Sequence, residues 1–201
     1  MSLGIKLLEP DDPKLKDKCS VVEDFGNPYY KEMIDEIVEI GKTCRAYASA
    51  APQFGISKQI IIIMTDKKMN INSVKEYDEY EVEYDVITYF NPNIISMKGT
   101  QYFCEACMSV RDTIGRVRRP YSIKIEAFDI NGNKINKTMK GLTAIIFCHE
   151  YDHLSGIEFT DRAEWIKITD IEERIEIRKS FPHVIENKTS EFVYTRIKSK
   201  S

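Results

Sequence analysis

The chain has 201 residues, of which 42% are hydrophobic and 30% are charged, and its formal net charge is −3. These values are typical of a single globular domain, and the negative charge argues against nucleic acid as a major partner. No apolar run approaches the roughly 20 residues that cross a membrane, and we expect no membrane partner. The N-terminus shows no basic start before an apolar segment, which predicts a cytoplasmic protein without a signal peptide and leaves an organellar origin open. Five cysteines without a secretory signal indicate reduced thiols, which serve as ligands or core residues.

The first third of the chain predicts a loop-rich arm, one helix and one strand. Residues 1–27 contain several prolines and are expected to form the arm. In residues 29–44, apolar side chains recur every three or four positions, with charged residues between them, which predicts a helix with one buried face. Small residues then cluster in 45–55, where the backbone can pass close to another segment. A strand is expected over residues 60–64.

The middle of the chain combines a polar segment with further strands. Residues 67–85 are mostly polar and charged, which predicts a solvated insertion or an exposed hairpin. A strand is expected over 86–90, ending at the Asn-Pro-Asn of residues 91–93. Residues 121–128 alternate between apolar and polar, and Asn-Gly at 131–132 is a strong hairpin signal. A strand pair is therefore expected to deliver the chain to the segment that follows.

Residues 141–156 are expected to form a helix that carries an H-E-x-x-H motif. Its two histidines, His149 and His153, are four positions apart and share one helix face, so both can bind one metal ion. Glu150 lies close enough to reach a water on that metal and would act as the general base. Apolar residues on the same face would form the wall of a pocket for an apolar side chain: Leu142, Ile145 and Ile146.

The last part of the chain predicts three short features. Residues 157–159 are expected to form a strand, and 169–181 a second helix with isoleucines four positions apart. Residues 186–201 are expected to form a polar tail that frays. Without an internal repeat or a domain boundary, the sequence predicts a single domain over 1–201, with the polar insertion and the polar tail as additions.

The spacing of the cysteines leaves the rest of the metal site open. A catalytic site of the zinc type takes three protein ligands and keeps one open position. Cys104 and Cys107 form a C-x-x-C that could complete a closed Cys₂His₂ structural site, although the segment up to His149 is far longer than the roughly 12 to 15 residues of a zinc finger. The other interpretation uses Cys107 alone, since Cys148 points to a different side of the helix. Asp152 is expected on the surface or beside one of the histidines.

Three segments, in this order, resemble the motifs of the peptide deformylase family. The family's Gly-x-Gly-Leu-Ala-Ala-x-Gln is similar to residues 46–53, its Glu-Gly-Cys-Leu-Ser to 105–109, and its Gln-His-Glu-x-Asp-His-Leu to 148–154. Residues 118–120 and 154–162 are similar as well. The likeness extends over most of residues 5–165, and three ordered motifs are far more specific than one.

The resemblance implies an α+β fold, with antiparallel β-sheets around a central helix that carries the H-E-x-x-H motif. It implies an enzyme that removes the formyl group from formyl-methionyl nascent peptides with one divalent metal ion, natively Fe²⁺, although Zn²⁺, Ni²⁺ or Co²⁺ can occupy the site. The ribosome near the nascent-chain exit is a further implied partner. By position, residues here resemble the family's metal ligands (Cys107, His149 and His153), its general acid/base (Glu150), its oxyanion donors (the Gln53 side chain and the Met108 backbone N–H) and its methionine pocket (Ala48, Leu142, Ile145 and Ile146).

The chain departs from these motifs in the residues that frame them: Ala46, Ala48, Ser49, Ala106 and Cys148. A Cβ intrudes wherever a motif glycine serves close approach or a positive φ. Cys148 replaces a glutamine and removes a hydrogen-bonding group. The retained chemical residues favour a divergent but active deformylase. The alternatives are a metalloamidase or peptidase acting on another N-acyl peptide, and a non-catalytic metal-binding relative, against which Glu150 and Gln53 argue.

Overall fold

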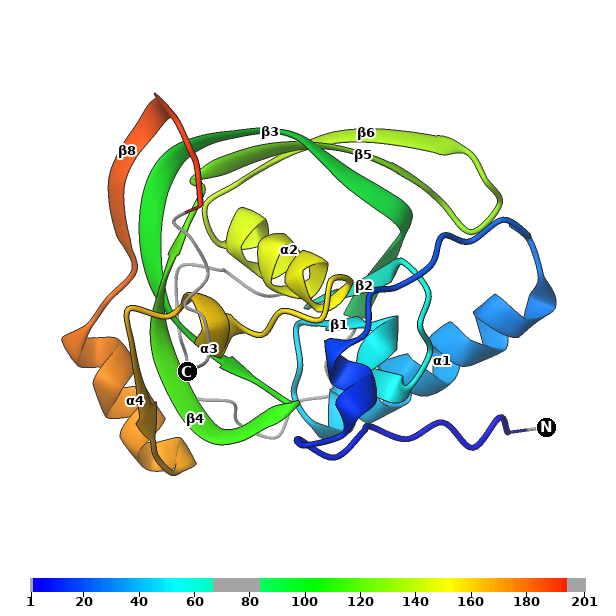
Figure 1. Cartoon of the computed structure of the whole chain (residues 1–201), viewed down its shortest axis with the longest axis horizontal. Helices are drawn as coiled ribbons and strands as arrows, with labels where there is room; N and C mark the ends of the chain where they lie inside the picture. Colours follow the sequence, from blue (N-terminus) through cyan, green and yellow to red (C-terminus); the bar gives the residue numbers. More distant parts are fainter. Residues whose placement is uncertain (1, 67–83, 195–201) are drawn as a thin grey trace.

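The computed structural model describes residues 2–66 and 84–194, which form a curved antiparallel sheet around one helix, α2 (Figure 1). The helical segments are η1 (Pro13–Lys16), α1 (Pro28–Thr43), η2 (Ala51–Phe54), α2 (Leu142–His153), α3 (Phe159–Arg162) and α4 (Ile171–Ser180). The strands are β1 (Ala48–Ala50), β2 (Ile60–Asp66), β3 (Tyr84–Cys107), β4 (Val110–Arg119), β5 (Ser122–Phe128), β6 (Lys134–Lys140), β7 (Trp165–Ile168) and β8 (Val184–Glu191). The predicted α+β class, with antiparallel strands around a central helix, is confirmed.

The long strand β3 pairs with four other strands and connects the parts of the sheet. The strands follow the order β1-β2-β3-β4-β7, and β3 also pairs with β5, which carries β6, and with β8. In Figure 1, β3, β5 and β6 arch over one side of α2. The expected hairpin is confirmed, because β5 and β6 pair in register from Ser122 with Lys140 to Phe128 with Lys134. The chain leaves this hairpin directly into α2.

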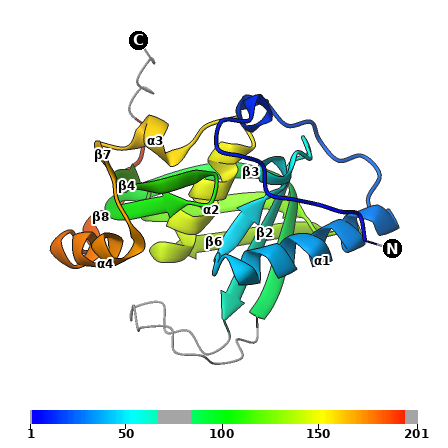
Figure 2. The ribbon, with the colours of Figure 1, turned by 90° about the horizontal axis from the view of Figure 1, so that it is seen from below.

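Strand β2 separates two hydrophobic cores. Its side chains alternate, so that Ile61 and Ile63 pack with residues of α2, while Ile60, Ile62 and Met64 pack with residues of α1. This alternation explains why the whole run is apolar. Helix α1 confirms the helix expected over 29–44. It begins at Pro28 and is capped by Asn27, whose side chain accepts from the Tyr29 N–H. The helix covers the side of the sheet opposite α2 (Figure 2).

Strand β3 does not end where the sequence predicted. The Asn-Pro-Asn at 91–93 lies within the strand, where the pairing with β5 shifts between Phe90 and Asn93. Asn91 has a φ of 46°, and its side chain bonds to both the N–H and the C=O of Val22, at 2.7 and 2.8 Å. The apparent turn signal is therefore a β-bulge, which bends the strand and ties it to the N-terminal arm.

The C-terminal third differs from the prediction at two places. Residues 157–159 form no strand, because Phe159 begins α3, where the Glu158 N–H donates to the Asp161 side chain at 2.9 Å. Residues 186–191, expected as the start of a frayed tail, belong to β8, which pairs with β3. Helix α4 lies within the expected range 169–181.

The polar insertion expected at 67–85 falls mostly outside the described residues, which resume at 84, and so does the end of the tail. Tyr84 and Asp85 already belong to β3. Within residues 2–66 and 84–194, no helix combines the length and the apolar character needed to cross a membrane.

Candidate active site

Three metal-binding groups converge where α2 passes the end of β3. Cys107 is the last residue of β3, and His149 and His153 lie one turn apart on α2. Their ligand atoms all lie within 4.8 Å of one another, and Cys107 Sγ is 3.3 Å from His153 Nε2. Metal bonds of about 2.0 to 2.3 Å place neighbouring ligands of a tetrahedral ion roughly 3.3 to 3.8 Å apart. The three side chains therefore have the spacing and chemistry to hold one metal ion.

The other two cysteine candidates lie away from this cluster. Cys104 is buried, and its sulfur faces the Phe181 carbonyl at the end of α4, at 3.7 Å. Burial raises the pKa of the Cys148 thiol to about 12, so Cys148 stays a neutral thiol and a poor metal ligand. The geometry thus favours three protein ligands and an open position over a closed Cys₂His₂ site.

A buried carboxylate fixes the orientation of the first histidine. Glu105 Oε2 is 2.9 Å from His149 Nδ1, and both Glu105 oxygens accept from the Arg119 guanidinium at 2.8 Å. Burial by itself would raise the pKa of Glu105, but Arg119 outweighs burial and lowers it to about 2. Glu105 is therefore a carboxylate that accepts the Nδ1 proton of His149 and leaves Nε2 to a metal.

Asp152 anchors the same helix to its surroundings. It is buried and accepts from Arg119 Nη1 at 2.5 Å and from Arg162 Nε and Nη2 at 2.6 Å each. Of the expected alternatives for Asp152, the surface position was wrong, because its side chain is buried. Instead, Arg119 joins Glu105 and Asp152, so one fully buried guanidinium links β3, β4 and α2.

Replacing Arg119 with leucine is expected to lower the free energy of unfolding by about 3 to 5 kcal/mol, because Glu105 loses its cation and Asp152 keeps only Arg162. Urea unfolding of the metal-free protein measures this change. Arg111→Leu is the matched control, since the exposed pair of Arg111 with Glu9 at 3.2 Å should change stability by no more than about 1 kcal/mol. Equal losses in the two variants would contradict the structural role of Arg119.

Glu150 has the properties of an acid/base group. Its side chain is buried, and within the described residues its Oε2 atom has no hydrogen-bond partner. Burial raises the pKa of Glu150 to about 7, against the opposing influence of His149. A group that titrates near neutral pH can both take and give a proton. The unpartnered buried oxygen is what an approaching water or substrate would satisfy.

The surroundings shift the pKa values of the two histidines in opposite directions. Burial lowers the pKa of His153, and His149 lowers it further. Burial also acts to lower the pKa of His149, but the Cys107 sulfur and Glu105 outweigh it and raise that pKa. The surroundings therefore favour the neutral form of His153, which is the form that binds a metal.

Gln53 and the turn that contains Met108 flank the cysteine ligand. The Gln53 side chain is buried, and its Oε1 accepts from the Ala50 N–H at 2.9 Å. Its Nε2 then donates to Ser109 Oγ at 3.0 Å and lies 3.4 Å from Cys107 Sγ. Met108 and Ser109 form the turn between β3 and β4. The structure thus brings both predicted oxyanion donors to the same end of β3 as Cys107.

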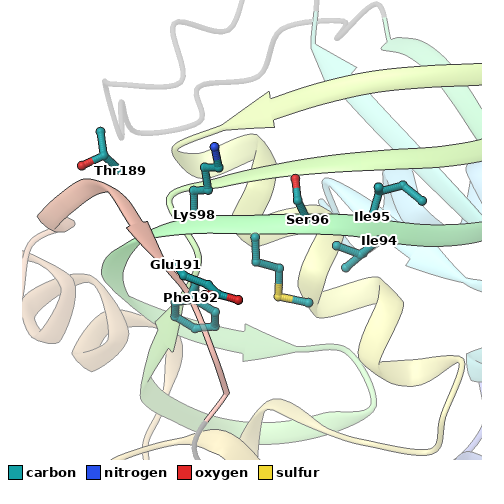
Figure 3. Close-up of a pocket in the computed structure, with 8 residues that line it drawn as sticks. Ile94, Ile95, Ser96, Lys98, Thr189, Glu191 and Phe192 are labelled. Atoms are coloured by element: carbon teal, nitrogen blue, oxygen red, sulfur yellow. The ribbon is translucent and has the colours of Figure 1, made fainter.

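The predicted pocket residues divide into two groups. Ala48 and Ile146 pack into the core between α2 and the sheet. Leu142 is half-buried at the first residue of α2, and Ile145 is buried one turn before His149. A surface pocket on the sheet lies elsewhere, between β3 and the C-terminal segment (Figure 3), and its lining includes none of the predicted site residues.

The alanines that replace motif glycines carry no backbone strain. Among the described residues, positive φ at a non-glycine position occurs at Arg45, Asn91 and Asp112. Ala46, Ala48 and Ala106 are not among them, so none of these positions needs the conformational freedom of glycine.

Sequence reasoning assigned no role to Glu105, Ser109 or Arg119. Glu105 and Ser109 flank Cys107 inside the second motif, and Arg119 lies in an Arg-Arg-Pro segment. Strand β4 carries four arginines, so its sequence holds no signal that marks Arg119 as the buried one.

Known proteins match the part of the chain that carries these residues. The sequence model for polypeptide deformylase matches residues 5–168. Peptide deformylase 2 of Clostridium acetobutylicum is 35% identical over 158 residues, which cover 78% of this chain and 94% of that protein. The peptide deformylase of Alkaliphilus metalliredigens is 32% identical over 161 residues, which cover 80% of this chain and 97% of that protein.

A solved structure gives the same result. The crystal structure of a probable peptide deformylase from synechococcus phage S-SSM7 has a TM-score of 0.69 and 30% sequence identity to this chain, covering 79% of this chain and 99% of that one. The fold, the ordered motifs and these relatives agree. The chain therefore belongs to the peptide deformylase family, the metal-dependent hydrolases that remove the formyl group from the N-terminus of nascent peptides.

Proposed function

We propose that Cys107, His149 and His153 hold the metal ion of this deformylase and that Glu150 transfers protons beside it. The observation that carries this proposal is the convergence of the three ligand atoms within 4.8 Å, next to a buried carboxylate with an unpartnered oxygen. We propose Fe²⁺ as the native ion. One thiolate and two imidazoles suit iron or zinc better than magnesium, and Ni²⁺ or Co²⁺ could replace them.

The residues around the ligands supply the rest of the chemistry. A divalent metal in this site would lower the pKa of water toward about 7 and so provide a nucleophile at neutral pH. Glu150 takes the proton released from the attacking water and then gives it to the leaving amine. These two proton transfers need no other titrating group. Burial keeps its pKa, at about 7, in the range where both transfers are feasible.

We assign the stabilisation of the oxyanion to Gln53 and Met108. As the nucleophile attacks the formyl carbon, negative charge develops on the formyl oxygen. The Nε2 donor of Gln53 is held in one orientation because its Oε1 accepts from the Ala50 N–H and Nε2 itself donates to Ser109. Together with the Met108 backbone N–H, it provides two donors, each worth roughly 2.7 to 4 kcal/mol of transition-state stabilisation.

The methionine side chain of the substrate is proposed to lie against α2, one to two turns before the histidines. Leu142 and Ile145 are the residues we assign to this contact, with Ala48 and Ile146 supporting it from the core. Because the substrate is the N-terminus of a nascent chain, we also propose that the enzyme meets it near the ribosomal exit.

Reconstitution of the metal-free protein tests this assignment. Anaerobic loading with Fe²⁺ is expected to restore turnover of formyl-Met-Ala-Ser, whereas acetyl-Met-Ala-Ser should react roughly 10- to 200-fold more slowly because its extra methyl group has to fit beside Gln53 and Cys107. Initial rates with both peptides and bound metal per chain are the measurements. If neither Fe²⁺, Ni²⁺, Co²⁺ nor Zn²⁺ restores turnover of the formyl peptide, the proposed site is wrong. Faster reaction of the acetyl peptide would favour a different N-acyl substrate.

A further inference from the structure

The C-terminal segment contacts the buried arginines that lie behind the proposed metal ligands. It lies beyond residue 168, where the match to the family ends, and it consists of α4, β8 and the residues up to 194. Figure 1 shows the chain turning back after β8 toward α2. Phe192 is buried, and its ring packs edge-on against that of Tyr194 with centroids 5.0 Å apart. The segment therefore holds Tyr194 in a fixed position.

Tyr194 contacts both arginines of the buried network. Its hydroxyl oxygen accepts from Arg119 Nη1 at 3.3 Å. The guanidinium of Arg162 lies over its ring, 3.9 Å from the centroid. Arg119 Nη1 also donates to Asp152, while the other side of the same guanidinium binds Glu105, so Tyr194 takes up a remaining N–H donor.

The position of Tyr194 corresponds to one of the departures from the family motifs. Cys148 stands where the third motif has glutamine, and Tyr194 lies close enough to influence the pKa of the Cys148 thiol. The C-terminal segment thus brings a hydroxyl group close to the position where α2 lacks the glutamine of the motif. The hydroxyl lies between the back of α2 and the arginine that orients Glu105.

We propose that Tyr194 is a positioning residue for the metal centre, which it influences through Arg119, Glu105 and His149. Its hydroxyl satisfies Arg119 on the side away from Glu105, so the guanidinium cannot turn, and Glu105 holds His149 in the orientation that presents Nε2 to the metal. The inference rests on the proposed metal site. A positioning role differs from a packing role because the influence of Tyr194 on the metal centre then depends on its hydroxyl oxygen and not on its ring.

Tyr194→Phe removes that oxygen and keeps the ring. Contacts one shell outside the ligands, such as that of Glu105 with His149, typically change metal affinity by about 10- to 100-fold. Tyr194 acts two residues further out, through Arg119 and Glu105, so we expect Co²⁺ affinity to fall by only about 3- to 10-fold. Chelator competition measures this affinity. The visible spectrum of the Co²⁺ protein should shift, and kcat for formyl-Met-Ala-Ser should fall while KM stays within about twofold of the parent value, because the peptide contacts are unchanged.

Tyr30→Phe is the matched control. It also removes a tyrosine hydroxyl with a hydrogen bond, to Asp24 at 2.8 Å, but on the α1 side of the sheet. Its thermal stability can fall, while its Co²⁺ spectrum, Co²⁺ affinity and kcat should match those of the parent. If Tyr194→Phe behaves in the same way, with lower stability but an unchanged spectrum, affinity and kcat, Tyr194 is only a packing residue and the proposal is overturned.

The same measurements separate this inference from the proposed function. A parent protein that binds no Co²⁺, or that binds it equally well after Cys107→Ser, would overturn the metal site and the role of Tyr194 with it. A parent that binds Co²⁺ through Cys107, combined with a Tyr194→Phe variant that is indistinguishable from it, would overturn the role of Tyr194 alone.

Discussion

Replacing Glu150 with glutamine is expected to lower kcat for formyl-Met-Ala-Ser by about 10²- to 10⁴-fold while one metal ion per chain stays bound. Glutamine has nearly the same shape but cannot take the proton from the attacking water or return it to the leaving amine. The three proposed ligand atoms belong to Cys107, His149 and His153, so the metal site should survive the change. Single-turnover kinetics together with metal analysis on the same sample measure both quantities.

Glu158→Gln is a matched control for this experiment. Glu158 is also a buried glutamate, but its carboxylate pairs with Lys16 at 2.6 Å and is not one of the proposed ligands or proton carriers. We expect its kcat to stay within about twofold of the parent value, since no step of the reaction uses this group. A fully metallated Glu150→Gln enzyme that keeps more than about a tenth of the parent kcat would rule out Glu150 as the essential proton carrier.

Replacing Cys107 with serine is expected to weaken Co²⁺ binding by at least about 100-fold, because loss of a direct ligand should cost more than loss of an outer contact. Cys104→Ser is expected to keep one metal ion per chain, since the Cys104 sulfur faces the Phe181 carbonyl instead of the histidines. The Co²⁺ spectrum should retain a thiolate charge-transfer band in the Cys104 variant and lose it in the Cys107 variant.

The two cysteine variants decide between the two interpretations of the C-x-x-C. A closed Cys₂His₂ site needs both sulfurs and would lose its metal in either variant. Loss of metal from a folded Cys104→Ser protein would therefore contradict the three-ligand site. Retention of the charge-transfer band after Cys107→Ser would do the same.

The local parts of the fold followed from the sequence, because their signals lie within a few residues. Apolar spacing marked α1, and the Asn-Gly at 131–132 marked the β5–β6 hairpin. The spacing of Ile171 and Ile175 marked α4, yet these side chains are 71% and 41% exposed, so the period identified the helix without identifying a buried face. The bulge at Asn91 was missed, because its stabilising partner Val22 is distant in sequence.

The site was only partly accessible from the sequence for the same reason. The histidine spacing on α2 is a local pattern, so the pair could be expected to face one ion. The choice between Cys104 and Cys107 depends on which side of β3 each faces near an irregularity at 105–107, and spacing alone does not contain that information. The role of Arg119 depends on Glu105 and Asp152 meeting across three elements. The resemblance to a family supplied the ligand set, but not this support.

The alternating side chains of β2 have a thermodynamic consequence. Because one strand forms a wall of both cores, the layer under α1 and the layer under α2 cannot unfold independently without exposing β2. Metal binding favours the folded state over the unfolded one, and the stabilisation it provides is shared by every segment that unfolds in the same cooperative step. Occupancy of a site on α2 should therefore slow amide exchange in α1, a helix that contributes no ligand. Metal bound at the proposed site would in this way stabilise both layers of the described fold.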